Sequence, residues 1–276
     1  MIFSLTTMLT IIFFTLGLII GSFLNVVICR MNTARTFGGR SACMSCKNCL
    51  SWYELIPVFS FLGLKGRCRN CKTKISIQYP LVELITGLVF ALILLKFQNI
   101  FFVDIGMFTA VYIYYAVMFS ILMVVVVYDL RHKIIPDTLS LVFGILAFLG
   151  LFVFSVNPFS EFTYVSLRVP TVLQFLSGPI AAAPFYLLWL VSNGRWMGLG
   201  DAKLALGLGW FLGLSAALSA LVLSFWAGTI VGVGLIILSK IYNWGYGMKS
   251  EIPFAPYLVF GTLVAFIFEL NLFNFI

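Results

Sequence analysis

Charge is scarce in this sequence. Only 9% of the 276 residues are Asp, Glu, Lys or Arg, whereas 62% are hydrophobic and the mean hydropathy is +1.11. Soluble globular domains carry roughly 25% charged residues, so this composition excludes one. The formal net charge of +8 therefore does not indicate a nucleic-acid partner, and we expect membrane lipid to surround most of the chain. A single histidine and the lack of a His-Glu-x-x-His motif also disfavour a zinc metalloprotease.

Long apolar stretches predict an all-α, polytopic membrane protein, because a membrane-spanning helix needs about 20 apolar residues. The first stretch is longer than the core of a signal peptide and lacks a small-residue cleavage site, so we expect it to remain in the protein. The stretch 202–214 is short for a span. Eight spans are predicted, at residues 5–28, 79–97, 104–129, 137–156, 171–192, 202–214, 216–238 and 255–274.

Positive charge alternates between the segments that join these spans. Nine Lys and Arg lie in segment 29–78, and fifteen of all 17 lie in alternate segments. Lys96 and Arg168 are left for the other side. Because cytoplasmic segments of membrane proteins are enriched in Lys and Arg, this pattern places segment 29–78 in the cytoplasm and both termini outside. The predicted location is a cytoplasmic (inner) membrane.

Two acidic residues lie at the ends of apolar stretches. Asp129 follows Val124–Tyr128, and Asp201 lies within Gly198-Leu-Gly-Asp-Ala-Lys203. An acid at the bilayer centre costs roughly 2.5–3.5 kcal/mol on insertion scales, so acids in membrane segments are usually functional. The predicted topology puts both acids at the cytoplasmic face. We therefore predict that Asp129 and Asp201 meet and act as a pair.

Five of the six cysteines lie between residues 43 and 71. Cys43 and Cys46 form one Cys-x-x-Cys pair, Cys68 and Cys71 form another, and Cys49 follows Cys46 at the same spacing. Two such pairs predict a tetrahedral zinc site of four thiolates, which is structural because no position is left for water. Disulfides are disfavoured in the cytoplasm. The spacing alone leaves open whether Cys43 or Cys49 pairs with Cys46.

Four other features either have two possible interpretations or predict only a local structure. Asn25 lies mid-span, where it either bonds another helix or touches substrate. Glu83 favours the first turn of a helix or has a function, and Asp137 after Pro136 is expected to be an N-cap. Residues 55–63 are too short for a span, and we expect a hairpin-like projection resting on the zinc site or the membrane surface.

The sequence resembles the type IV prepilin peptidases, which are leader peptidases and N-methyltransferases similar to other Gly-x-Gly-Asp intramembrane aspartyl proteases. The resemblance covers nearly the whole chain, and it rests on the order of several motifs rather than on any one. The motifs are Gly21-Ser-Phe-Leu-Asn-Val-Val-Ile28, the two cysteine pairs with Leu55-Ile-Pro57, Tyr79-Pro-Leu-Val-Glu-Leu84, Asp129 with Ile135-Pro-Asp137, Gly198-Leu-Gly-Asp-Ala-Lys203 and Ile252-Pro-Phe-Ala-Pro-Tyr257.

The resemblance implies that Asp129 and Asp201 are catalytic and cleave a basic leader from pilin or pseudopilin precursors. It also implies methylation of the new N-terminus with S-adenosylmethionine, although no binding motif for that cofactor is recognisable. The zinc ligands it implies are Cys43, Cys46, Cys68 and Cys71. Met44 and Ala255 depart from the family pattern, which has proline and glycine there.

From this we predict two regions: residues 1–78, with the first span and the cysteine-rich loop as the methyltransferase region, and the peptidase domain 79–276. The substrate cleft is expected to include Gly198, Gly200, Lys203 and Pro253, with the glycines leaving room for an extended peptide. Paired carboxylates hydrolyse a peptide bond with an activated water and need no nucleophilic side chain. The alternatives are a proton-coupled transporter, a zinc metalloprotease and a non-enzymatic zinc scaffold.

Overall fold

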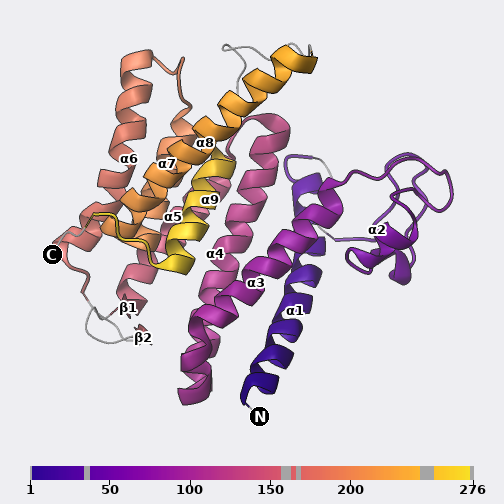
Figure 1. Ribbon diagram of the computed structural model, residues 1–276, viewed down its shortest axis with the longest axis horizontal. Coiled ribbons are helices and arrows are strands. Elements are labelled where there is room, and N and C mark those ends of the chain that lie inside the picture. Colours follow the sequence, from indigo (N-terminus) through magenta and orange to yellow (C-terminus); the bar gives the residue numbers. More distant parts are fainter. Residues whose placement is uncertain (1, 34–37, 157–162, 166–168, 243–251, 274–276) are drawn as a thin grey trace. The chain divides into compact units, whose positions relative to one another are not determined.

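The computed structural model describes residues 2–33, 38–156, 163–165, 169–242 and 252–273. Figure 1 shows a chain built almost entirely of helices, with one small pair of strands. The membrane-type helices are α1 (Ile2–Arg30), α3 (Gln78–Val103), α4 (Ile105–His132), α5 (Asp137–Val153), α6 (Val172–Ser192), α7 (Leu199–Leu212), α8 (Leu214–Tyr242) and α9 (Ala255–Phe268). The smaller elements are the 3-10 helix η1 (Trp52–Leu55), the short helix α2 (Phe59–Gly63), and the antiparallel strands β1 (Phe154–Val156) and β2 (Thr163–Val165).

The eight long helices match the eight predicted spans, which confirms the polytopic all-α class. Five of them, α1, α3, α4, α6 and α8, are long and apolar enough to cross a membrane, and α5 and α9 are shorter apolar helices. Helix α7 has 14 residues and rises about 21 Å, less than a bilayer core of about 30 Å. The predicted span 137–156 was too long, because the helix ends at Val153 and β1 follows. The predicted span 255–274 was also too long, because α9 ends at Phe268.

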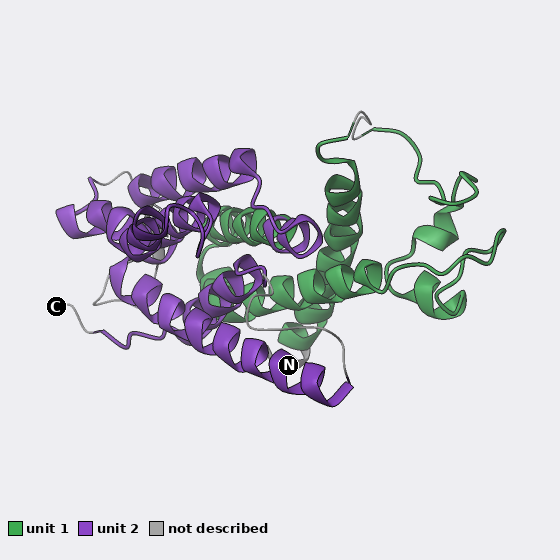
Figure 2. Ribbon diagram, turned by 90° about the horizontal axis from the view of Figure 1, so that it is seen from above, with its two compact units in different colours: residues 1–124 green, residues 125–276 purple. Residues whose placement is uncertain are grey.

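The chain forms two compact units, residues 1–124 and 125–276 (Figure 2). In the first unit α1 packs along α3. Their backbones approach so closely at Gly17 that a Cβ there would lie 2.7 Å from the Cα of Gly87. Small residues at such crossings let membrane helices pack tightly. The cysteine loop between α1 and α3 belongs to this unit and projects sideways from them (Figure 1).

The second unit surrounds α7, which packs against α5 and α6 and also contacts α8 and α9. Helix α7 ends at Gly213, whose φ of +79° lies in the left-handed region that favours glycine. Helix α8 begins at the next residue. This arrangement buries α7 residues such as Leu204 and Ala205 completely and fixes the start of α7, where Asp201 lies.

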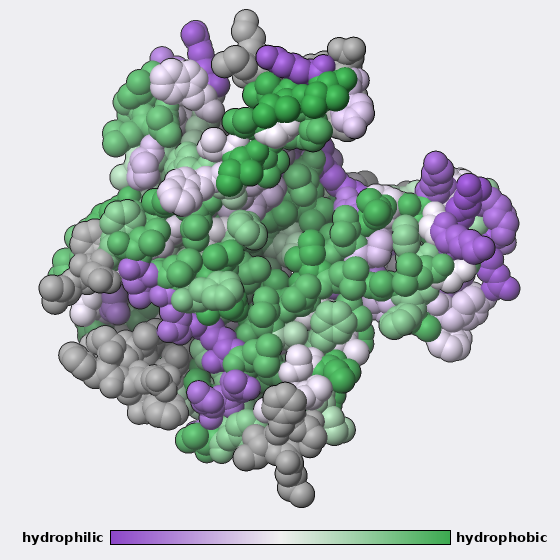
Figure 3. Space-filling model, in the orientation of Figure 1, coloured by the Kyte–Doolittle hydropathy of each residue, from purple (hydrophilic) through white to green (hydrophobic). Residues whose placement is uncertain are grey.

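The hairpin-like shape predicted for residues 55–63 was wrong, whereas the predicted contact with the zinc site or the membrane surface stays a prediction. The chain forms η1 and α2 there, joined by a turn at Val58. The local sequence explains the start of η1, because Ser51 and Glu54 form a reciprocal capping box. Figure 3 shows a mostly apolar surface over the helices, with hydrophilic residues on the projecting loop and in smaller groups elsewhere.

Candidate active site and metal centre

Asp129 lies in the last turn of α4 and is 4% exposed. Its Oδ2 atom accepts a hydrogen bond of 3.2 Å from the backbone N–H of Ala255, the first residue of α9. The N-cap residue of α9, Phe254, makes no side-chain capping bond of its own. Asp129 therefore caps α9 from another helix, and the positive end of the α9 dipole stabilises its negative charge.

Asp201 lies in the first turn of α7, three residues after the N-cap Gly198. Its backbone N–H donates to the carbonyl of Gly198 over 3.3 Å, which closes the first turn. The carboxylates of Asp129 and Asp201 lie near enough to repel each other electrostatically. The structure thus brings together the two acids that the sequence predicted as a pair, with Asp201 in the first turn of α7 and Asp129 bonded to the first N–H of α9. Two helix dipoles act on the pair.

The glycines beside Asp201 have different surroundings. A Cβ added to Gly198 would make only ordinary contacts, the nearest with Oδ2 of Asp201 at 3.8 Å, so there is room for a small group beside this residue. A Cβ added to Gly200 would lie 3.0 Å from the Cβ of Ile135. The close packing against Ile135 therefore explains why position 200 is a glycine, which the sequence did not reveal. A role in substrate binding stays a prediction for both glycines.

Lys203 forms an ion pair with Asp137, with 2.6 Å between Nζ and Oδ1. Asp137 is the first residue of α5 rather than its predicted N-cap, and its carboxylate pairs with Lys203. The pair joins the start of α5 to the first turn of α7. Pro253 lies just before α9, and Pro256 lies in the first turn of that helix.

Aromatic packing positions the start of α9, and sequence reasoning missed it. The ring of Phe254 lies 5.9 Å from that of Phe185 on α6 and 5.2 Å from that of Phe225 on α8. These contacts hold the Ala255 N–H in place for Asp129. The only sequence signal was the phenylalanine between Pro253 and Ala255, which by itself indicates burial alone.

The four cysteines implied by the resemblance come together in the first unit. Their Sγ atoms all lie within 4.8 Å of one another, and those of Cys43 and Cys71 are 3.7 Å apart. A tetrahedral zinc site with Zn–S bonds of about 2.3 Å needs S–S distances of about 3.8 Å. The residues therefore fit a metal ion bound by four thiolates. Residues 43, 46, 68 and 71 supply one ligand atom each.

The two cysteine pairs form one structural motif twice. Cys43 N–H donates to the carbonyl of Asn48, and Cys68 N–H donates equivalently to that of Thr73, each over 2.9 Å. The residue after each second cysteine, Lys47 or Lys72, has a φ of +56° or +59°.

Flanking bridges complete this repeat. They join Ala42 to Cys49 and Arg67 to Lys74. Cys49 thus corresponds to Lys74 and lies outside the cluster, which favours the register with Cys43.

Hydrogen bonds to sulfur favour partial ionisation of this cluster. Bonds from the side chain and backbone of Thr73 lower the pKa of Cys71 to about 6. The backbone N–H of Cys46 lowers the pKa of Cys43 below its ordinary value. The backbone N–H of Asn48 lowers the pKa of Cys46, but desolvation and the neighbouring thiols outweigh it and raise this pKa to about 11. Four thiolates so close together need a bound cation.

Asn25 and Glu83 both link parts of the first unit. The Asn25 side-chain amide donates to the carbonyl of Tyr79 on α3 over 3.1 Å, as expected for a residue that bonds another helix. Glu83 is buried within α3, and its Oε2 atom accepts the N–H of Val58 in the cysteine loop over 2.8 Å. Glu83 therefore caps neither end of α3. It connects the cysteine loop to that helix instead.

The fold and site define a polytopic membrane protein with a paired-acid centre and a separate four-cysteine cluster. Residues 15–97 match the family described as "Bacterial Peptidase A24 N-terminal domain", and residues 116–233 match the "Type IV leader peptidase family". The chain is 35% identical over 225 residues to a Myxococcus xanthus protein named prepilin leader peptidase/N-methyltransferase, covering 81% of the chain and 62% of that protein.

Relatives with the same name extend the likeness to almost the full chain. A Bacillus subtilis protein is 30% identical over 96% of both chains, and an Aeromonas salmonicida protein is 31% identical over 91% of this chain and 88% of its own. No solved structure matches. The chain belongs to the type IV leader peptidase family and is a membrane peptidase. This result favours the peptidase over the transporter, the metalloprotease and the scaffold.

Proposed function

We propose that this protein cleaves the basic leader from type IV prepilin-like precursors, using Asp129 and Asp201 and a water molecule between them. The observation that carries the proposal is the meeting of two carboxylates, one in the first turn of α7 and the other bonded to the first N–H of α9. The names of the relatives support a prepilin-like substrate.

The carboxylate pair acts as both base and acid. Two carboxylates this close favour a state with one proton between them. The ionised member removes a proton from water, which attacks the scissile carbonyl, while the protonated member donates to the carbonyl oxygen. The proton gained from water then passes to the leaving amine. The two carboxylates titrate as a unit, so the role of base is not assigned to Asp129 or to Asp201 alone.

The space beside Gly198 is the proposed site for an extended peptide. The junction of a precursor between its basic leader and its apolar helix must be extended for water to reach the carbonyl. Gly198 leaves room for such a strand beside Asp201, and Pro253 lies just before the α9 N-terminus that Asp129 caps. The fifteen Lys and Arg in alternate segments support cleavage at the cytoplasmic face, with the cysteine loop in the cytoplasm and both termini outside.

We further propose that the four-cysteine cluster binds Zn²⁺ as a structural ion. Cys43, Cys46, Cys68 and Cys71 would hold it, and it would cross-link the two ends of the loop without an open position for water. This loop lies in the proposed region 1–78.

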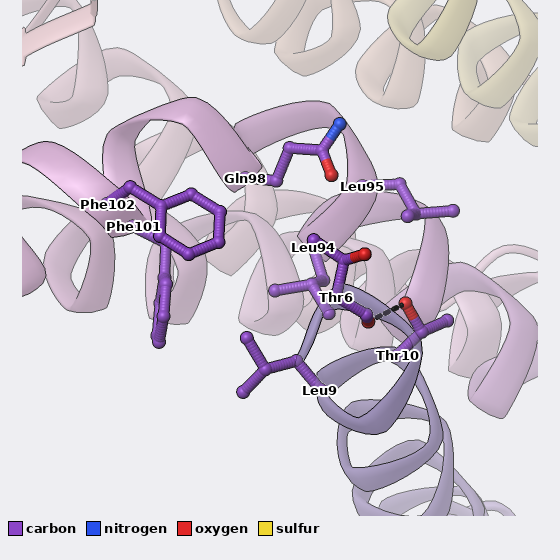
Figure 4. Close-up of a pocket in the computed structure, with 8 residues that line it drawn as sticks. All are labelled: Thr6, Leu9, Thr10, Leu94, Leu95, Gln98, Phe101 and Phe102. Carbon is purple, nitrogen blue, oxygen red and sulfur yellow. Dashed lines mark hydrogen bonds between the residues drawn. The ribbon is translucent and has the colours of Figure 1, made fainter. Parts of the chain in front are cut away.

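Methylation of the new N-terminus is the second proposed activity, supported by the relatives' names. S-adenosylmethionine supplies the methyl group in such a reaction. The pocket shown in Figure 4 does not suit this cofactor, because its lining of Leu, Phe, Thr and Gln side chains carries no charged group. We therefore assign no site for the cofactor.

The direct test is leader removal by the purified chain in detergent. A synthetic precursor with a basic leader and an apolar helix is incubated with the wild type and with Asp129→Asn and Asp201→Asn. Cleavage by the wild type alone is expected. Substantial cleavage by either variant would refute the assignment of the pair, and no cleavage by a folded wild type would refute the substrate class.

A further inference from the structure

The Glu83–Val58 hydrogen bond fixes the depth of α2 relative to the membrane helices. Glu83 is the sixth residue of α3, which places it roughly 7–8 Å along the helix axis from Gln78. On α1, Gly21 lies level with it, since a Cβ at Gly21 would be 2.7 Å from the Cα of Glu83. Gly21 is nine residues, or roughly 13 Å, before Arg30, the only charged residue of α1. Glu83 therefore lies deeper in the membrane than the polar ends of α1 and α3.

The surface of α3 at this depth is apolar. Leu81, Leu84 and Ile85 are all exposed large hydrophobic residues on either side of Glu83 in the sequence. In a membrane-spanning helix such residues face lipid. The lipid boundary therefore lies at or before Leu81, so the start of α2 is tied to a residue at lipid depth.

The turn that precedes α2 is strained and held in place by Glu83. Val58 has φ +61° and ψ −50°, and the N–H of Phe59 bonds to the carbonyl of Pro57 over 2.6 Å. This is the rare γ-turn with a positive φ, which is strained for a β-branched residue. The Glu83 carboxylate binds the Val58 N–H that this turn presents. The strained turn and its hydrogen bond to Glu83 together indicate that the position of α2 is fixed relative to α3.

Several large apolar side chains of η1 and α2 are exposed in the part of the chain that the structure describes. Trp52 is 75% exposed, Phe59 70% and Leu62 64%. Tryptophan and other aromatic residues are enriched where proteins meet the membrane–water interface. The neighbouring loop residues are basic, with Glu54 as the single acid between residues 38 and 77. These basic residues are Arg40, Lys47, Lys65, Arg67, Arg69, Lys72 and Lys74.

We propose that residues 52–62, the interfacial segment, insert into the lipid interface of the leaflet at the Arg30 end of α1. Trp52, Phe59 and Leu62 lie among headgroups and upper acyl chains, and the surrounding cations face anionic lipid headgroups. The cysteine cluster is thereby held at the membrane surface from two directions: by Glu83 and by lipid. This inference does not depend on the proposed peptidase activity.

The test measures lipid contact at position 59 in the full chain. A polarity-sensitive fluorescent amino acid replaces Phe59, and in a control chain it replaces Asn70 between Cys68 and Cys71. Both chains are reconstituted into phosphatidylcholine–phosphatidylglycerol vesicles. Brominated acyl chains are expected to quench position 59 several-fold more than position 70, and aqueous iodide is expected to do the reverse. Quenching of position 59 by iodide alone, or by neither agent because protein covers it, would overturn the proposal.

Two variants then test the role of Glu83 with the same label at position 59. Glu83→Gln keeps an acceptor for the Val58 N–H, so lipid quenching should persist. Glu83→Ala removes the acceptor, so the label should become more accessible to iodide. If the alanine variant is as lipid-quenched as the wild type, Glu83 does not set the depth of the segment. The wild-type comparison stands even if the alanine variant fails to fold.

Discussion

Asp129 on α4 holds the first backbone N–H of α9, at Ala255, over 3.2 Å. The same carboxylate thus has a structural task and, in our proposal, a chemical one. The two tasks separate on substitution because an asparagine side chain still accepts an N–H but cannot exchange a proton with water. This difference allows catalysis to be tested without loss of the cap.

We expect Asp129→Asn to abolish cleavage while the melting temperature stays close to that of the wild type. Asp129→Ala should abolish cleavage and also lower stability by about 1 kcal/mol, the usual cost of losing a helix cap. Cleavage of a precursor and thermal unfolding in detergent are measured side by side. Residual activity in the asparagine variant would show that Asp129 caps α9 and takes no part in catalysis.

Asp201→Asn should likewise abolish cleavage, and Asp137→Asn is the matched control. Asp137 is another aspartate in the first turn of a helix, but its carboxylate is well exposed and pairs with Lys203. Exposed ion pairs contribute about 0–1 kcal/mol. Asp137→Asn should therefore keep at least half of the cleavage rate. A loss as complete as that of Asp201→Asn would give Asp137 a direct role.

The two glycines of the Gly-Leu-Gly-Asp sequence should respond differently to alanine. Gly198→Ala adds a methyl group that makes only ordinary contacts, so stability should be unchanged and any loss should appear as a higher KM for the precursor. Gly200→Ala places a methyl group 3.0 Å from the Cβ of Ile135, so stability should fall by about 1–3 kcal/mol, as for overpacking. Thermal unfolding and cleavage kinetics distinguish the two. Equal destabilisation at both positions would contradict the described packing.

Metal content should depend on Cys43 and not on Cys49. The repeat of the two cysteine pairs places Cys49 at the position of Lys74, outside the cluster. Elemental analysis of Cys49→Ser should therefore show about one zinc per chain, as in the wild type, by the four-ligand rule. Cys43→Ser should lose most of it. The opposite pattern would assign the site to Cys46 and Cys49.

Zinc affinity should fall with falling pH, and more steeply below about pH 6. Hydrogen bonds from Thr73 lower the pKa of Cys71 to about 6, so above that pH this thiol is already ionised and releases no proton to the metal. Below it, zinc must displace a further proton, and the slope of log affinity against pH should increase by about one. Competition with a chelator between pH 5 and pH 8 measures this slope. A slope that is constant through pH 6 would contradict the lowered pKa of Cys71.

Composition and charge alone predicted most of the fold. The apolar stretches predicted all eight long helices because a bilayer demands that backbone groups be satisfied within each span. Their ends were less predictable: Val153 is followed by apolar residues that form β1, and nothing in their hydropathy marks the change. The helices at residues 52–63 were missed because η1 and α2 are held by distant groups, notably Glu83, rather than by local periodicity.

At the site, the residue types were predictable and their partners were not. Asp129 and Asp201 stood out because acids are rare beside apolar stretches. The Asp129–Ala255 hydrogen bond joins residues that are 126 positions apart in the sequence. The Asp137–Lys203 ion pair joins residues that are 66 positions apart. The cysteine spacing left two registers open. The backbone repeat around Lys47 and Lys72 distinguishes them, and such a repeat is invisible in side-chain spacing.

The contact between Gly200 and Ile135 has a mechanical consequence. Eight positions separate Asp129 from Asp137 along the chain, and this short connection touches α7 twice, at Gly200 and through the Lys203 ion pair. The helix that carries Asp201 is thus fastened to the connection that begins at Asp129. Any shift of that connection moves one acid relative to the other. Substitutions at Ile135 should therefore change the turnover rate by altering the spacing of the pair.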